Sequence, residues 1–217
     1  MYPGLGSFRG VLKWSQGGRV AESEMLYKQE FGGIRNTIAD ARLETLQAEP
    51  KFMASAKRIY DRNCAVCHGY DAAGQASLFP NLVDDVWQWG GSPEEIEQTL
   101  RDGRNAVMVG WAGPLGADGV REVADYIKVM GDDRGAGHPG QIKYNQFCVA
   151  CHGASGEGTP ALGAPNLADD TWLYGSSDED VIETITNGRT GVMPDFGGRL
   201  DDTQIRLLVA WLTREAD

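Results

Sequence analysis

Apolar residues recur every three or four positions along much of this chain, which is the spacing of helices that bury one face. The clearest such stretches are 52–60, 118–130, 141–147 and 202–215. Two shorter helices are expected at 96–100 and 181–185, because each follows a serine suited to cap a first turn and stops at a glycine. No stretch shows the convincing alternation of a strand. The pattern therefore predicts an all-α fold.

The second half of the chain repeats the first. Aligning Cys64 with Cys148 gives an offset of 84 residues, which becomes 85 after one inserted residue. The pairs that match include Pro80 with Pro165, Asn81 with Asn166, Trp87 with Trp172, Arg104 with Arg189, and Met108 with Met193. The chain therefore contains two copies of a unit of roughly 80 residues.

This repeat sets the domain boundaries that we expect. A stretch rich in Gly, Pro and charge separates the two copies, as a linker does. The expected organisation is an N-terminal extension at 1–50, a first domain at 51–132, a linker at 133–140 and a second domain at 141–217. Within the extension, the charged stretch 20–49 carries spaced apolar residues that predict one or two amphipathic helices.

Composition narrows the class of protein. The chain has 217 residues and a formal net charge of −11 at pH 7. Its length is enough for one or two domains with a real core. Its acidity argues against a nucleic-acid partner, because nucleic-acid binding relies on basic residues. No apolar run reaches the roughly 20 residues that a membrane-crossing helix needs.

The four cysteines occur in two short motifs with the pattern C-x-x-C-H, namely Cys64-Ala-Val-Cys67-His68 and Cys148-Val-Ala-Cys151-His152. This pattern is typical of c-type haem attachment. On a helical turn, the two thiols can bond to the two vinyl groups of one haem, and the adjacent histidine then lies under the iron as its proximal ligand. The motifs therefore predict two covalent haems c.

Other uses of these cysteines fit less well. A zinc site made from both pairs would leave the two histidines unexplained. A thioredoxin-like site needs a βαβ pattern and no following histidine, and disulfides within such pairs are strained. The recurrence of the complete motif favours haem over all three.

The second axial ligand decides whether each haem carries electrons or does chemistry. Met108 lies 40 residues after His68, and Met193 lies 41 residues after His152. A His/Met pair closes the iron to substrate and suits electron transfer. The competing interpretation is that both methionines fill gaps in the core. Their matching positions in the repeat favour ligation.

Several other residues are candidates for haem contacts. The guanidinium groups of Arg104 and Arg189 suit haem propionates, unless both lie free on the surface. Trp87 and Trp172 can pack on a porphyrin and point their N–H groups at a propionate, although ordinary core packing explains them nearly as well.

Three further polar residues have expected local roles. Asn81 and Asn166 are expected to fix their loops through side-chain bonds to the backbone. His138, which lies outside both motifs, is expected to be an exposed titratable residue of the linker. The alternative is a distal ligand that competes with Met108.

The repeated segments FPNLVDDVWQWGGSPE and GAPNLADDTWLYGSS, together with the opening YPGLGSFRGVLKWSQ, resemble subunit III (CcoP), the dihaem cytochrome c subunit of cbb3-type cytochrome c oxidases. The resemblance covers essentially the whole chain. It implies two tandem class I cytochrome c domains on the periplasmic side of the bacterial inner membrane. Carried over by motif, it pairs His68 with Met108 and His152 with Met193.

The resemblance also implies a function. The family subunit receives electrons from a donor cytochrome c and passes them to a monohaem subunit and then to the oxygen-reducing subunit of the respiratory chain. On that basis the chain is not an enzyme on its own. Two other classes stay open: a dihaem peroxidase with one open iron position, and a free-standing dihaem carrier or cytochrome subunit of a dehydrogenase.

The sequence departs from the family pattern in two places. The family subunit has a transmembrane anchor before the opening stretch, whereas Met1 here directly precedes Tyr2. We interpret the chain as a form of this membrane-associated subunit that lacks its anchor. Val109 replaces the proline usual after the first methionine.

The N-terminal extension has two possible roles at this point. It can dock on neighbouring subunits, or it can pack on the first domain.

Overall fold

The computed structural model describes residues 16–214. Its elements in chain order are α1 (Gln16–Asp40), α2 (Leu43–Gln47), α3 (Pro50–Asn63), α4 (Ala65–His68), α5 (Pro93–Asp102), β1 (Arg104–Val109), α6 (Ala112–Val129), α7 (Pro139–Phe147), α8 (Val149–His152), the 3-10 helix η1 (Pro160–Leu162), α9 (Asp178–Asn187), β2 (Gly188–Met193) and α10 (Asp202–Leu212). The fold is mostly helical, which confirms the predicted class.

The chain divides into two compact units, and the boundary falls between Arg42 and Leu43. In the described part of the first unit, α1 is a long helix whose apolar Val20, Met25 and Leu26 are more than half exposed. The predicted helical stretch 20–49 contains most of α1, which begins four residues earlier at Gln16, and all of the short α2. The opening segment YPGLGSFRGVLKWS lies outside the described residues. All that follows concerns the second unit.

The helices that carry the repeat start and stop as their sequences predict. Ser92 and Ser177 cap α5 and α9, and each forms a reciprocal capping box with the acidic residue three positions later. The helices end at Gly103 and Gly188, whose φ angles of 68° and 74° lie in the region that favours glycine. The local signals of the sequence therefore locate both helices correctly.

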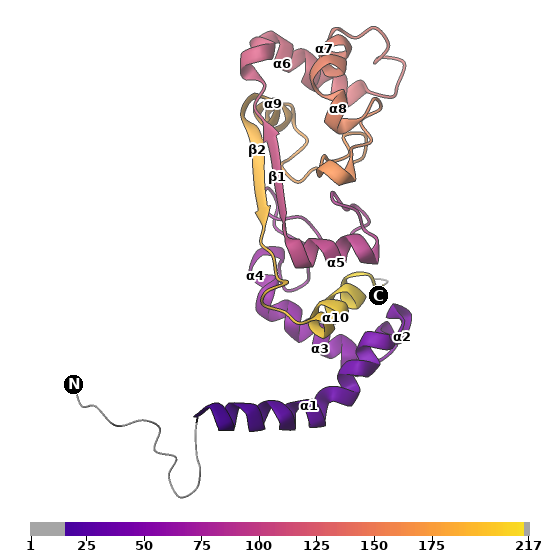
Figure 1. Ribbon diagram of the computed structural model, residues 1–217. Helices are drawn as coiled ribbons and strands as arrows, with labels where there is room; N and C mark the ends of the chain where they lie inside the picture. The colour runs from indigo at the N-terminus through magenta and orange to yellow at the C-terminus, as the bar shows by residue number, and fades with distance from the viewer. Residues whose placement is uncertain (1–15, 215–217) are drawn as a thin grey trace, which may run out of the picture. The chain divides into compact units, whose positions relative to one another are not determined.

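The prediction that the chain has no strands is wrong at two segments. β1 and β2 form an antiparallel two-stranded ribbon in which Arg104 lies opposite Met193 and Met108 lies opposite Arg189. Figure 1 shows the two strands side by side. Each strand pairs with its own copy in the repeat, so neither segment needs a strong strand pattern by itself.

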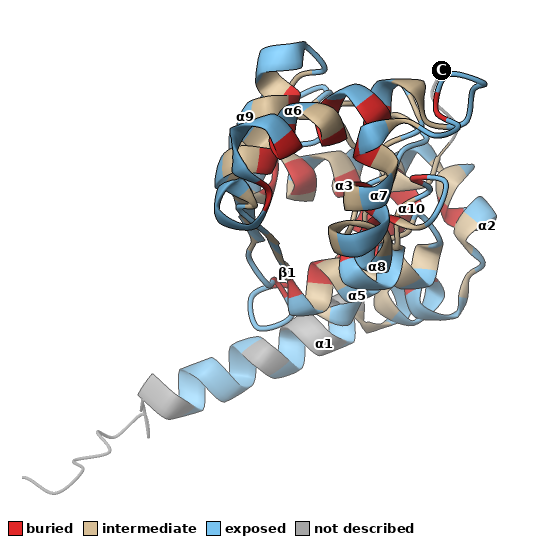
Figure 2. Ribbon diagram, turned by 90° about the horizontal axis from the view of Figure 1, so that it is seen from above, coloured by how far each residue is buried: buried red, intermediate tan, exposed pale blue. Residues whose placement is uncertain are grey.

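The last helix of each repeat packs on the other repeat. α10 contacts α2, α3 and α5, whereas α6 contacts α7 and α9. We call the first group, α2 to α5 with α10, lobe I, and the second group, α6 to α9, lobe II. Figure 2 shows that buried positions recur along both exchanged helices, α6 and α10. Neither lobe is therefore one continuous stretch of the chain, because each contains helices from both repeats.

Equivalent aromatic contacts stabilise the inside of each lobe. In lobe I, the rings of Tyr60 and Trp211 lie 4.6 Å apart between centroids. In lobe II, Tyr144 and Tyr126 occupy the matching positions of the repeat, at 5.5 Å. Each pair joins one residue from the first repeat to one from the second. The exchange of α6 and α10 between the repeats therefore forms the same kind of helix contact in both lobes. The pairing of β1 with β2 is a further contact between the two repeats.

The connection between α6 and α7 gives a physical reason for this arrangement. Only residues 130–138 separate these helices, and helices joined by a short connection usually pack as neighbours. The crossing is close, because a Cβ added to Gly140 would lie 1.9 Å from the carbonyl oxygen of Glu122. The side chains of Lys143 and Glu122 form an ion pair across it.

Candidate haem sites

Each C-x-x-C-H motif forms one helical turn. Cys64 is the N-cap of α4, and the backbone N–H groups of Cys67 and His68 donate to its carbonyl oxygen at 3.1 and 3.0 Å. The second motif repeats these distances in α8. Burial raises the pKa of the Cys64 thiol to about 11, as it does for the equivalent cysteine of lobe II. The turn brings both thiols and the histidine of a motif to one place.

The two motif histidines are held in the form that a metal requires. His68 and His152 are only 5% and 8% exposed. The Nδ1 atom of His68 lies 3.0 Å from the carbonyl oxygen of Pro80, and that of His152 lies 3.0 Å from the carbonyl oxygen of Pro165. A carbonyl only accepts, so Nδ1 carries the proton and Nε2 keeps its lone pair for iron. Burial lowers the pKa of both imidazoles, which favours this neutral form.

A buried tyrosine braces each motif, and our reading of the sequence missed this role. The hydroxyl of Tyr60 donates to the carbonyl oxygen of Gly69 at 2.8 Å, and Tyr144 makes the same bond to Gly153 at 2.7 Å. Both side chains are fully buried. The signal that could have revealed them is the repeat itself, because the two tyrosines are 84 residues apart, like the cysteines.

The two candidate methionines lie on the sheltered face of the ribbon. Exposure alternates along β1 and, from Arg189 onward, along β2, and Met108 and Met193 belong to the partly buried set whereas Val107 and Val192 are exposed. Met108 packs against the apolar cluster of lobe II. The structure therefore brings Met108 to the lobe that contains His152, which differs from the pairing by sequence order.

Both candidate arginines are held in place by their own lobes. The Nε–H of Arg104 donates to Oγ1 of Thr99 at 2.8 Å, and its guanidinium lies 5.0 Å from the ring centroid of Trp89. Arg189 repeats this arrangement, with a bond of 2.9 Å to Oγ1 of Thr184 and an aromatic ring at 4.6 Å. These contacts orient both side chains, so they are not free surface arginines.

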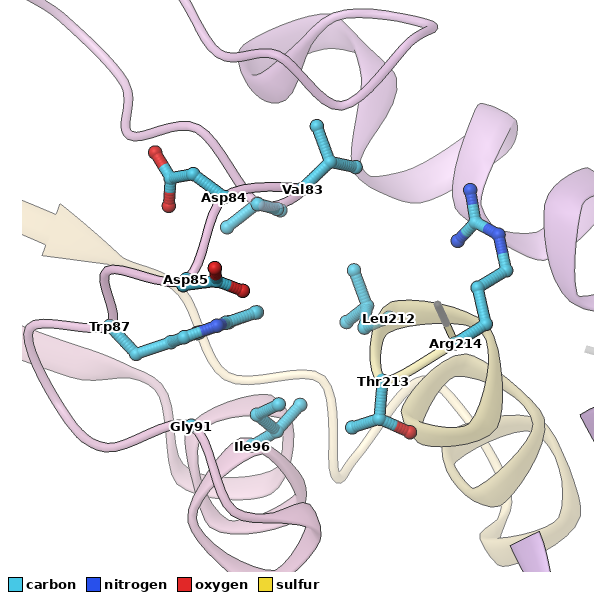
Figure 3. Close-up of a pocket in the computed structure, with 10 residues that line it drawn as sticks. Val83, Asp84, Asp85, Trp87, Gly91, Ile96, Leu212, Thr213 and Arg214 are labelled. Atoms are coloured by element: carbon cyan, nitrogen blue, oxygen red, sulfur yellow. The ribbon is translucent and has the colours of Figure 1, made fainter. Parts of the chain in front are cut away.

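The two tryptophans have different surroundings. Trp172 packs at the edge of the lobe II cluster, and its indole N–H donates to the carbonyl oxygen of Asp169 at 3.1 Å. Trp87 lines a cavity of about 290 Å³ in lobe I. Figure 3 shows its ring and Ile96 on one side of this cavity, with Leu212 and Thr213 at the end of α10 on the other. The cavity is thus another place where the end of α10 meets residues of the first repeat within lobe I.

His138 has a structural role that neither prediction anticipated. Its Nδ1 atom accepts a hydrogen bond of 3.1 Å from the backbone N–H of Gly140 and caps α7. Its ring lies 5.9 Å from that of Tyr126. The residue is therefore half-buried on lobe II and is not a freely exposed residue of the linker.

Asn81 and Asn166 fix their loops as expected. Their Oδ1 atoms accept from the backbone N–H groups two residues ahead, at 2.9 and 2.8 Å. These turns directly follow Pro80 and Pro165, whose carbonyl oxygens hold the motif histidines. The repeated Pro-Asn-Leu sequence therefore supports the histidine side of each site.

The structure also bears on the alternatives raised by the sequence. Within residues 16–214, no three or more His, Cys, Asp and Glu side chains lie together as a group that could hold a metal ion. Over the same residues, no helix combines the length and the apolar character of a membrane span.

The donors present fit a c-type haem in each lobe. A helical turn presents two thiols, a buried imidazole has a free Nε2, and a partly buried methionine lies at each end of the ribbon. The fold and these motifs define a tandem class I c-type cytochrome. Comparison with known proteins makes the assignment narrower. The model of the family "Cytochrome C oxidase, cbb3-type, subunit III" matches residues 52–127 and 135–212, and the chain belongs to this family.

Individual relatives agree with this assignment. The chain is 40% identical to the cbb3-type cytochrome c oxidase subunit FixP of Bradyrhizobium sp. (strain ORS 278), over 94% of this chain and 76% of the relative. It is 38% identical to the FixP subunit of Bradyrhizobium diazoefficiens, over the same shares. It is 34% identical to subunit CcoP of Rubrivivax gelatinosus, over 98% of this chain and 70% of that protein.

Proposed function

We propose that this chain is the dihaem electron-transfer subunit of a cbb3-type oxidase and carries no catalytic centre of its own. The observation that supports this most directly is the duplicated histidine geometry, in which a buried Nδ1 is 3.0 Å from a proline carbonyl in each lobe. A c-type haem supplies reversible one-electron redox chemistry at such a site. Membership of the oxidase subunit family favours this role over a peroxidase or a free carrier.

The proposed haem-binding residues are those of the two motifs and the two methionines. Thioether bonds come from Cys64 and Cys67 for one haem, and from Cys148 and Cys151 for the other. The iron ligands are His68, His152, Met108 and Met193. Arg104 in β1 and Arg189 in β2 provide positive charge for the haem propionates, because each keeps guanidinium N–H groups beyond the one bonded to threonine.

The proposed partners are a donor cytochrome c and, within the oxidase, its monohaem and catalytic subunits. The proposed location is the periplasmic side of the bacterial inner membrane, where a transmembrane anchor holds the family subunit. A formal charge of −11 favours a donor with a basic face, because such charge steers diffusional encounter. This steering weakens as salt is added.

Three measurements on the purified haem-loaded protein test the function. Haem quantitation is expected to give two haems c per chain. The oxidised spectrum is expected to show the near-infrared Met-to-iron band and low-spin iron, without rapid binding of cyanide or carbon monoxide. High-spin iron that binds these ligands rapidly would instead favour the peroxidase. Reduction by a basic cytochrome c is expected to slow as ionic strength rises, and a salt-independent rate would contradict steering.

A further inference from the structure

We infer that Gln88 and Trp89 of lobe I fasten the two lobes together at Gly163 of lobe II, and that this contact fixes the gap across which electrons pass between the two haems. We call these three residues the latch. The inference rests on the proposed haem-binding function and concerns the loops that support the motif histidines. It gives Trp89 a positioning role in electron transfer within the chain.

Each haem motif is followed by a short loop that leads to the partner of its histidine. In lobe I an antiparallel bridge between Gln75 and Phe79 closes this loop, and in lobe II a bridge between Thr159 and Ala164 does so. We call the two segments loop I (75–79) and loop II (159–164). The residue after each loop is the proline whose carbonyl oxygen lies 3.0 Å from Nδ1 of the motif histidine. A displacement of either loop therefore moves a group that holds a proposed iron ligand.

Loop II contains one residue more than loop I, because it spans six positions where loop I spans five. This is the place where the offset of the repeat changes from 84 to 85 residues. Near the end of loop II, Gly163 has a φ of 64°, in the left-handed region that favours glycine. The longer loop thus gives lobe II a glycine that the sequence of loop I lacks.

Trp89 packs directly on this glycine. A Cβ added to Gly163 would lie within 2.5 Å of three atoms of the indole ring, so a side chain at this position would displace the ring or the loop. The side-chain amide of the adjacent Gln88 donates to the carbonyl oxygen of Gly163. Two neighbouring side chains of the first repeat therefore hold loop II at a single point.

The other contact of the Trp89 ring is with its own lobe. The guanidinium of Arg104, a proposed propionate partner, lies 5.0 Å from the ring centroid, within the range of a cation–π contact. Trp89 thus contacts both an arginine of lobe I and the loop that supports His152 in lobe II. Because an indole is a rigid plane, these two contacts hold the lobes at one separation.

A simpler contact occurs at the matching place of loop I. The backbone N–H of Ser77 donates to the carbonyl oxygen of Leu173 at 2.9 Å. Leu173 and Tyr174 are the repeat equivalents of Gln88 and Trp89 at the offset of 85. The side chain of Leu173 has no hydrogen-bond donor, and loop I has no glycine for Tyr174 to cover. Tyr174 also lies over an arginine, at 4.6 Å, so it is the matched control for Trp89.

The latch predicts a specific kinetic signature. Electron tunnelling between haems slows steeply as the gap between them widens, so its rate depends on how closely the lobes are held. Loss of the contact at Gly163 is expected to let loop II move away from lobe I without changing the ligands of either haem. The expected result is slower transfer between the haems at unaltered reduction potentials.

Nuclear magnetic resonance of the half-reduced dihaem protein measures this rate. The haem methyl protons of oxidised low-spin haem have large paramagnetic shifts, so their line shapes report exchange at each haem, and dilution separates transfer within a chain from transfer between chains. Trp89→Leu and Gly163→Ala are each expected to slow transfer within the chain several-fold. Tyr174→Leu and Gly131→Ala are expected to keep the unsubstituted rate. Gly131 is a suitable control because its φ is 88° and a Cβ there would meet nothing within 4 Å.

A milder variant keeps the test available if Trp89→Leu does not fold or load haem. Gln88→Leu removes only the hydrogen bond to Gly163 and is expected to slow transfer less than Gly163→Ala does. Equal rates in the latch variants and their controls would refute the latch and leave the proposed function standing.

Potentiometric titration separates the latch from an electrostatic effect. Gly163→Ala is expected to leave both reduction potentials unchanged, since it alters no charge. A shift in potential large enough to account for its slower transfer would refute the positioning role. A chain without two low-spin haems would overturn the proposed function, and the latch with it, and haem quantitation recognises that outcome before any rate is measured.

Discussion

Gly103 is the position where the exchanged strand and lobe I meet most closely. Its φ and ψ of 68° and −174° belong to a region that essentially only glycine occupies, which costs any other residue about 1–3 kcal/mol. In addition, an alanine Cβ would lie 2.5 Å from the Met193 carbonyl oxygen and 2.8 Å from the Asp195 nitrogen, so the strand end must move. We expect Gly103→Ala to lower the free energy of unfolding by about 2–4 kcal/mol.

Gly116 is a matched control for this substitution. Its φ and ψ of 64° and 172° lie in the same region, but a Cβ there would meet nothing within 4 Å. Gly116→Ala therefore carries the backbone cost alone, about 1–3 kcal/mol. Denaturant titration of both holo-proteins, with the near-infrared band as a second readout, measures the difference. If Gly103→Ala matched Gly116→Ala within about 0.5 kcal/mol and the band were unchanged, the close approach of Met193 would carry no energy.

Three smaller predictions concern residues that support the sites. Tyr60→Phe removes a buried bond to the carbonyl of Gly69 and is expected to cost about 1 kcal/mol. Burial raises the pKa of Tyr60. The stability that this raised pKa contributes is therefore present below about pH 10 and is lost as the pH rises above that value. Above that pH, Tyr60→Phe is expected to lose less stability than the unsubstituted protein. Ser92→Ala is expected to cost about 1 kcal/mol. Arg104→Gln is expected to lower the reduction potential of one haem by about 40 mV.

Each of these predictions has a control on the same protein. Urea titrations at pH 8 and pH 11 compare Tyr60→Phe with Tyr70→Phe, since Tyr70 is exposed. Ser55→Ala on the surface of α3 is the comparison for Ser92. Potentiometric titration sets Arg104→Gln beside Arg121→Gln, which removes an exposed charge. Equal effects within any pair would contradict the role assigned to its buried or capping member.

The sequence alone predicted the parts of the fold that local chemistry specifies. The capping serines and the glycines that end α5 and α9 are encoded within a few residues, and each was located correctly. Both C-x-x-C-H segments also form the expected helical turn. The repeat exposed the matching methionines and arginines. These features need no knowledge of which distant segments meet.

The ribbon and the exchange could not be predicted in the same way. The segments of β1 and β2 contain Gly191 and polar residues, and each becomes a strand only by pairing with its copy. Tyr126 in α6 and Trp211 in α10 occupy matching positions of the repeat, and each packs on the matching tyrosine of one lobe. Helical periodicity identifies a buried face but does not say which partner covers it.

The position of α10 has a consequence for how the protein is made. Lobe I contains the first haem motif, yet it is completed by the last helix of the chain, as in the 3.0 Å bond from Gln47 to Ala210 across 163 residues. Such long-range contacts form late, because the intervening chain must first be ordered. During synthesis from the N-terminus, Cys64 and Cys67 therefore emerge well before α10, so the first motif is available for haem attachment while lobe I is still incomplete.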